Sequence, residues 1–131
     1  MDATQALADL TEISSQIVKA TIVDGDGSVL ATTIAEENIS KSFAAGVTKL
    51  VDEAGRAGIA RGLVGLTQFE AATLDGSVFV VRRGARVIAA TTRPDPTVGL
   101  VFYDLKHCLR SIEDAPKPTP RTRKKATDGE A

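Results

Sequence analysis

The sequence predicts an α/β (α+β) domain of three layers, in which helices cover both faces of an antiparallel sheet. Segments with apolar residues at helical period alternate with short β-rich runs in the order α-β-β-α-β-β-β-α. The two-residue link Asp75-Gly76 between two of these runs is typical of a hairpin, which makes the joined strands antiparallel. Two runs, "VFVV" and "VIAA", show no polar alternation, as expected of strands that are covered on both faces.

The first part of the chain predicts a helix and a hairpin. Residues 4–16 place apolar side chains three and four apart, with Thr4 as the expected N-cap. Strands are expected over residues 17–23 and 29–33. The stretch "DGDG", residues 24–27, joins them, and we expect its glycines to adopt positive φ.

Two kinds of ligand loop are excluded for this stretch. A calcium loop of the D-x-D-x-D-G type begins well with Asp24 and Asp26, but Val29 stands where the glycine belongs. A dinucleotide-binding loop fails because Leu30 replaces the third glycine and because a strand follows instead of a helix. The sequence therefore predicts a hairpin turn here.

The helix predicted over residues 35–58 carries two apolar stripes side by side. The first stripe is expected to face the sheet and consists of Ile39, Phe43, Gly46, Leu50 and Ala54. The second stripe consists of Ser40, Ala44, Val47 and Val51. Together they are wider than one amphipathic face needs, and small residues would let another helix approach closely. We therefore expect the second stripe to face a partner.

Three strands follow a glycine-rich connector that begins where Gly55 and Gly58 are expected to end the middle helix. These strands are predicted over residues 66–74, 77–82 and 86–92. The first of them carries the polar side chains Gln68 and Glu70 on either side of Phe69. Polar residues among apolar neighbours are typical of an edge strand, which is a natural place for pairing with another strand.

The last predicted helix covers residues 93–112, with Asp95 as its cap and Pro96 at its first position. Its apolar residues recur with a helical period, and its polar residues are expected to lie off that face. The polar residues are Asp104, Lys106, His107 and Arg110.

Composition and charge limit the classes of function. The formal net charge is −1, so no general field attracts nucleic acid. We expect residues 1–114 to form the single domain and residues 115–131 to be a disordered basic tail with three prolines, because this segment has no large apolar residue. The tail has no aromatic residue to stack on bases, so nucleic acid is an unlikely partner and only a tail contact is conceivable. No apolar run is long enough to span a membrane, and one cysteine fits a cytoplasmic protein.

Catalytic chemistry and bound metal are not indicated. The only histidine, His107, lies off the apolar face of its helix, whereas Cys108 lies on that face and is expected to be a core residue. One histidine and one cysteine do not suffice for a zinc site, and no pair of carboxylates is marked by spacing. We therefore expect no enzyme activity of its own, no catalytic residue, no metal and no cofactor.

The element order, together with "LADLTEISSQIVKATIVDGDGSVLATT", "GLTQFEAATLDGSVFVVRRGARVIAATT" and "PDPTVGLVFYDLKHCLRSI", resembles the Roadblock/LC7 family, in particular its small stand-alone actinobacterial members. The resemblance covers residues 4–113. It implies a five-stranded antiparallel sheet with the middle helix on one face and the terminal helices on the other. It also implies a homodimer built by the middle helices and third strands, and a Ras-like small GTPase as partner, with no catalytic residue to transfer.

Three hypotheses for function follow. The first is a non-enzymatic homodimeric adaptor that binds and modulates a Ras-like small GTPase or a related signalling or motility complex. The second is a small-molecule sensor of the PAS or GAF type, and the third is a purely structural scaffold. For the first, the expected interface residues are Ser40, Ala44, Val47, Val51, Gln68, Phe69 and Glu70.

Overall fold

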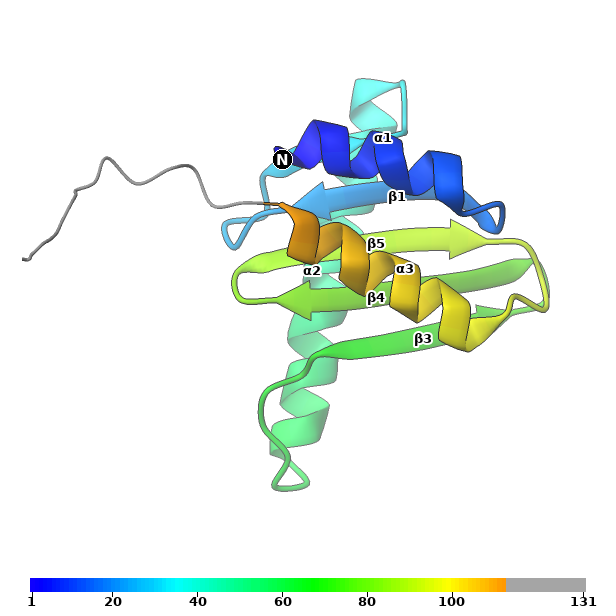
Figure 1. Ribbon diagram of the computed structural model, residues 1–131. Helices are drawn as coiled ribbons and strands as arrows, with labels where there is room; N and C mark the ends of the chain where they lie inside the picture. Colours follow the sequence, from blue (N-terminus) through cyan, green and yellow to red (C-terminus); the bar gives the residue numbers. More distant parts are fainter. Residues whose placement is uncertain (113–131) are drawn as a thin grey trace, which may run out of the picture.

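The computed structural model describes residues 1–112 (Figure 1). The expectations for residues 113–114 and for the tail 115–131 lie outside the described residues. Eight elements occur in the predicted order. They are α1 (Ala3–Ile13), β1 (Ile17–Val23), β2 (Val29–Thr32), α2 (Glu37–Ile59), β3 (Gln68–Thr73), β4 (Gly76–Arg83), β5 (Arg86–Thr92) and α3 (Val98–Ser111).

The strands form one antiparallel five-stranded sheet in the order β2-β1-β5-β4-β3. In Figure 1, α1 and α3 lie side by side on the near face of this sheet, and α2 lies behind it and runs across the strands. The predicted fold class, with helices on both faces, is confirmed. Since β3 ends the sheet, its prediction as an edge strand is also confirmed.

The paired central strands show why their sequences do not alternate between apolar and polar residues. In the β4–β5 pair, Val81 lies opposite Ile88 and both contribute to the core under α1 and α3. The neighbouring pair, Val80 and Ala89, contributes to the core under α2. Both faces of these strands therefore need apolar side chains, as their runs of apolar residues predicted.

The core under α1 and α3 is the larger of the two. Phe79, Ile88 and Leu105 are fully buried there, and the rings of Phe79 and Phe102 form a T-shaped pair at a centroid distance of 5.0 Å. Asp104 was expected to lie off the apolar face, but it is only 8% exposed. That expectation was wrong because α1 packs against α3 and covers one flank of the helix as well as its sheet-facing side.

The helix ends differ from the sequence predictions in ways that local chemistry explains. The N-cap of α1 is Asp2 rather than Thr4, since the Asp2 carboxylate accepts a hydrogen bond of 2.8 Å from the backbone N–H of Gln5. The expected cap Asp95 of the last helix is also wrong. Asp95 has φ +59°, and α3 begins only after Thr97, whose backbone N–H donates to the side-chain oxygen of Gln16 at 2.6 Å.

The middle helix is longer than its glycines predicted. Gly55 and Gly58 lie inside α2, which continues to Ile59 because a single helical glycine costs only about 1 kcal/mol. The chain turns at Gly62, which has φ +78°, and the backbone N–H of Leu63 donates back to the carbonyl of Gly58 at 2.9 Å. The stop signal is thus the later glycine, in the left-handed conformation.

Among residues 1–112, no helix is both long enough and apolar enough to cross a membrane.

Candidate functional site

The two stripes of α2 face the opposite way from the prediction. Ser40, Ala44 and Val47 are 3–5% exposed, and Val51 is half-buried. Ala44 and Val47 belong to the core between α2 and the sheet, and Val51 packs against it. The second stripe therefore faces the sheet of its own chain, and the expectation that it faces a partner was wrong.

The first stripe is the one that remains accessible. Ile39 is 54% exposed and Leu50 is 44% exposed, with Gly46 exposed between them. Phe43 lies at the boundary, since it is half-buried and packs against the core under α2. A helix that crosses a sheet closely needs small side chains beneath it, which Ser40 and Ala44 supply. The larger residues of the first stripe are consequently displaced toward the solvent.

The edge of β3 carries unpaired backbone groups. The backbone N–H of Arg82 donates to the carbonyl of Thr67 at 2.8 Å, and Gln68 lies opposite Val81. In an antiparallel pair the hydrogen bonds alternate along the strand, so the odd-numbered residues of β3 bond to β4. The N–H and C=O groups of Gln68, Glu70 and Ala72 then point away from the sheet, where they are available to another strand.

The side chains of the predicted β3 residues divide between the two faces. Phe69 is half-buried and packs against the core under α2. Gln68 and Glu70 lie opposite Val81 and Phe79, which places them on the face of α1 and α3. The structure therefore brings Phe69 to the same face as α2 and keeps Gln68 and Glu70 on the other.

The length of α2 exceeds the width of the sheet that it crosses. Its 23 residues extend about 34 Å at 1.5 Å per residue. Five strands spaced by about 4.8 Å cover only about 19 Å from the first to the last. Figure 1 shows the result, because the C-terminal turns of α2 extend beyond β3. This overhang ends near the exposed side chains of Ile59, Leu63 and Val64.

Part of the sheet on the α2 face lies open beside the first stripe. A groove of about 410 Å³ runs along Ile39 and Phe43 and reaches Val78 on β4. Val18, at the other wall of this groove, is 49% exposed. Next to it, Leu74 at the β3–β4 turn is 97% exposed. The first stripe, the edge of β3 and this groove together form an apolar surface that residues 1–112 leave uncovered.

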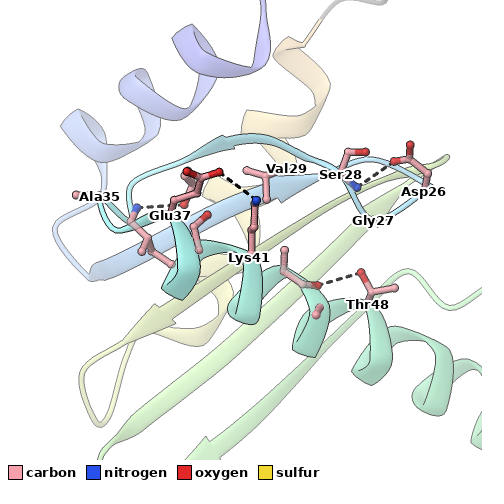
Figure 2. A pocket seen from close by; sticks show the side chains of 13 residues that line it. Asp26, Gly27, Ser28, Val29, Ala35, Glu37, Lys41 and Thr48 are labelled. Carbon is pink, nitrogen blue, oxygen red and sulfur yellow. Dashed lines mark hydrogen bonds and ion pairs between the residues drawn. The ribbon is translucent and has the colours of Figure 1, made fainter.

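A second groove, of about 840 Å³, lies on the opposite flank of α2, against β2 and the β1–β2 turn (Figure 2). Figure 2 shows Glu37 and Lys41 paired at its mouth, with an ion pair of 3.1 Å between well-exposed side chains. Thr48 donates to the carbonyl of Ala44 at 3.0 Å. These polar side chains are thus engaged within their own helix, and the groove presents no arrangement of acid and base.

The "DGDG" stretch forms the predicted turn at the end of this groove. The backbone N–H of Gly27 donates to the carbonyl of Asp24 at 2.9 Å, and Gly27 has φ +87° as expected. Gly25 does not share that conformation; a Cβ there would lie 3.1 Å from the Cβ of Ala85, so close packing explains this glycine. Hydrogen bonds from Ser28 lower the pKa of the exposed Asp26 carboxyl. These aspartates therefore stabilise a turn.

The two remaining reactive side chains are apart from any cluster. Cys108 is buried as predicted, and burial, with a smaller effect of the Asp9 charge, raises the pKa of its thiol to about 11. A thiol of this kind stays protonated and unreactive at neutral pH. His107 is exposed and stacks on Tyr103 at a centroid distance of 6.4 Å. Among residues 1–112, no three His, Cys, Asp or Glu side chains are grouped to hold a metal ion.

The fold, by contrast, has clear counterparts among solved structures. Neither a family model nor a curated protein matches the sequence. A Roadblock/LC7 domain from Streptomyces avermitilis has a TM-score of 0.75 and 17% identity, over 85% of this chain and 94% of that one. The gliding protein MglB from Thermus thermophilus has a TM-score of 0.68 and 14% identity, over 81% and 82%. A structure described as MglB with a tetrameric arrangement has a TM-score of 0.72 and 13% identity, over 84% of each chain. This chain therefore has the Roadblock/LC7 fold.

Proposed function

We propose that this chain, with its Roadblock/LC7 fold, is a cytoplasmic, non-enzymatic homodimeric adaptor that binds and modulates a Ras-like small GTPase or a related signalling or motility complex. The observation that carries the proposal is the uncovered apolar surface on the α2 face. It combines the exposed residues Ile39 and Leu50 with the unpaired edge of β3. A surface of this kind marks an interaction site on a protein of this size.

A second copy of the chain fits this surface. Two β3 edges related by a two-fold axis pair as antiparallel strands, which joins the two sheets into one. The C-terminal turns of each α2, which extend beyond β3 in Figure 1, then lie over the partner's sheet. The first stripes of the two helices face each other in this arrangement, and Gly46 lets them approach closely.

The protein partner follows from the resemblance and from the chemistry of the fold. Roadblock/LC7 proteins of bacteria bind Ras-like GTPases, and two structures with this fold are MglB proteins, one of them described as a gliding protein. The resemblance to this family carries no catalytic residue over to this chain. We therefore propose that the dimer acts by contact with the switch regions of the partner and contributes no catalytic residue of its own.

The oligomeric state gives the first test. Static light scattering at micromolar protein is expected to give close to twice the chain mass of 13.7 kDa. A monomer at that concentration would contradict the proposed dimer.

Proline substitutions test the strand pairing at the β3 edge. The N–H of Ala72 points away from β4, so Ala72→Pro should preserve the fold and abolish the dimer, because proline removes the donor that the partner strand needs. Ala71→Pro is the matched control. It removes a hydrogen bond to β4 and should lower the melting temperature strongly. If Ala72→Pro remains dimeric by light scattering, β3 does not form the interface.

The partner is tested by a pull-down with purified Ras-like GTPases of the same organism, loaded with GTP or GDP. Binding that depends on the nucleotide and is lost with Ala72→Pro supports a GTPase adaptor that works as a dimer. A dimer that binds none of these GTPases would instead favour the scaffold hypothesis.

For the sensor hypothesis, the candidate ligand site is the groove of about 840 Å³ beside α2. Its size is within the range of small-molecule sites. A thermal-shift screen with metabolites separates this hypothesis from the adaptor. A ligand that raises the melting temperature of the wild type, and does so less in a variant with Ala45→Leu, an exposed residue that lines the groove, would favour the sensor.

A further inference from the structure

A second surface, on the side of α3, has a distinct chemistry. A shallow hollow of about 310 Å³ lies between the start of β3, the end of β4 and the last turns of α3. Three cationic side chains on the face of α1 and α3 line it, namely Arg83, Lys106 and Arg110. Arg82 is also a lining residue, but it pairs with Val87 of the core under α2, so its side chain lies on the α2 face. The remaining lining residues are Thr67, Gln68, Val81 and Leu109. No carboxylate is among the described residues that line this surface, which we call the basic hollow.

This concentration of positive charge contrasts with the excess of acidic residues in the domain. Residues 1–112 contain 13 Asp and Glu and 11 Lys and Arg, so acidic residues are in excess overall. Lys41 and Arg56, both on α2, form ion pairs with Glu37 and Glu53 of the same helix. Within residues 1–112, the three cations of the basic hollow have no carboxylate partner. Three like charges at one place repel one another.

Helix stability accounts for only one of these three side chains. Arg110 lies in the last turn of α3, where a cation interacts favourably with the helix dipole. Lys106 lies a turn earlier, and Arg83 comes from β4. Val81 and Leu109 form the floor of the hollow, and both side chains are almost fully buried by other residues of the core. The cations are therefore not needed for the core beneath them.

We propose that the basic hollow binds an acidic segment of a protein partner, rich in Asp or Glu. Arginine pairs with carboxylates through two parallel hydrogen bonds, and lysine adds a flexible point charge. Arg83 comes from β4 and Lys106 and Arg110 come from α3, and all three are exposed, so one small anion reaches only some of them. An extended segment with several carboxylates can engage all three.

The proposal does not depend on the proposed dimer. Arg83, Lys106 and Arg110 lie on the face of α1 and α3, whereas the uncovered apolar surface lies on the α2 face. Pairing of two β3 edges leaves this face open on both copies, so a dimer would present two basic hollows.

Fluorescence anisotropy with a rhodamine-labelled hexaglutamate peptide, amidated at its C-terminus, tests the proposal on the full chain. We expect saturable binding that weakens as salt is added. Arg83→Glu and Lys106→Glu should each raise the dissociation constant about tenfold or more, because each reverses a charge in the hollow. Circular dichroism shows whether each variant is folded, and the milder Lys106→Ala, with a smaller loss expected, replaces any variant that is not.

The matched control is Arg93→Glu. It makes the same charge change at an exposed residue that follows the far end of β5, whereas Arg82 and Arg83 pair with the start of β5. The dissociation constant of this variant for the hexaglutamate peptide should equal that of the wild type. The proposal is overturned if the peptide does not bind, if Arg93→Glu weakens binding as much as Arg83→Glu, or if hexalysine binds equally well. Binding of inorganic phosphate without binding of hexaglutamate would overturn it too, since the hollow would then be a phosphate site.

Discussion

The two faces of the sheet differ in how completely one chain covers them. On the face of α1 and α3, two helices side by side enclose the core, and Phe79, Ile88 and Leu105 have no exposed surface. On the opposite face a single helix crosses the strands, and Phe43, Phe69 and Val78 are only partly buried. The comparison suggests that the first face makes the domain fold, while the second is left for another protein to complete.

The difference also separates two kinds of apolar residue on α2. Val47 of the second stripe completes the thin core of its own chain, whereas Leu50 of the first stripe adds nothing to it. Substitutions that place a carboxylate on each stripe should therefore have different consequences, although the two residues are only three positions apart.

The largest effect is expected for Val47→Glu. Val47 is 3% exposed, so the new carboxylate would be buried without a partner beneath α2. A buried, unpaired charge costs several kcal/mol, roughly 3–5, which is a large part of the roughly 5–15 kcal/mol that stabilises a typical domain. The chain should be unfolded or melt far below the wild type by circular dichroism. A well-folded variant would show that the second stripe does not face the sheet.

Phe79→Ala should destabilise the other face by a comparable or slightly smaller amount. Phe79 is fully buried, and its ring contacts that of Phe102. Truncation of a buried phenylalanine typically costs about 3–5 kcal/mol through lost contacts and a residual cavity. Urea unfolding should show this loss without any change in a dimer dissociation constant measured in the absence of urea. A loss below about 1 kcal/mol would mean that this core is not as closely packed as its burial indicates.

A smaller, pH-dependent effect is expected from Cys108 on the same face. Burial raises the pKa of its thiol from 9.0 to about 11, and the charge of Asp9 adds to this. Above about pH 9 the unfolded chain releases this proton more readily than the folded one. The group therefore leaves stability unchanged below about pH 9 and lowers the free energy of unfolding as the pH rises toward 11.

Cys108→Ala isolates this contribution from those of other titrating groups. The variant should be less stable than the wild type at neutral pH, because a buried side chain is shortened, yet the difference should narrow above about pH 9. Urea midpoints at neutral and alkaline pH measure the loss of stability at neutral pH and its decrease at alkaline pH. A difference that stays constant with pH would show that the thiol ionises equally easily in the folded and unfolded chain.

The sequence determined the fold well because several signals agreed. The hairpin turns, the apolar strands and the helical periods all pointed to the same order. The β3–β4 hairpin was predicted correctly, but its two-residue link is Leu74-Asp75 rather than Asp75-Gly76, because Gly76 begins β4 opposite Thr73. Gly76 has φ +148°, and a Cβ on it would clash with the backbone carbonyl of Thr92. The prediction of β3 as an edge strand rested on polar Gln68 and Glu70 and was likewise correct.

The orientation of α2 could not be derived from its sequence in the same way. Two adjacent stripes give the same helical period, and the larger side chains were assigned to the sheet because burial of large residues is usual. Instead, α2 lies close to the sheet, and the small side chains of Ser40 and Ala44 are the ones buried beneath it. The basic hollow was also missed, since its cations come from segments more than twenty residues apart and only the fold brings β4 and α3 together. The Arg82-Arg83 pair before a turn was the available signal.

The smallest effect on folding, and the sharpest test of the comparison, is expected for Leu50→Glu against Leu100→Glu. Leu50 is 44% exposed on α2 and Leu100 is 49% exposed on α3, so each change should alter the stability of a monomer by no more than about 0.5 kcal/mol. Their effects on association should differ. In a two-fold dimer formed by the first stripes, Leu50→Glu introduces two carboxylates into one apolar contact, which should raise the dissociation constant about 100-fold or more. Leu100→Glu, on the face that the chain covers itself, should leave it unchanged. Sedimentation velocity over a concentration series measures both constants. Equal constants for the two variants would mean that the open face of the sheet is not where the copies meet, and that its exposed leucine and isoleucine serve a different partner.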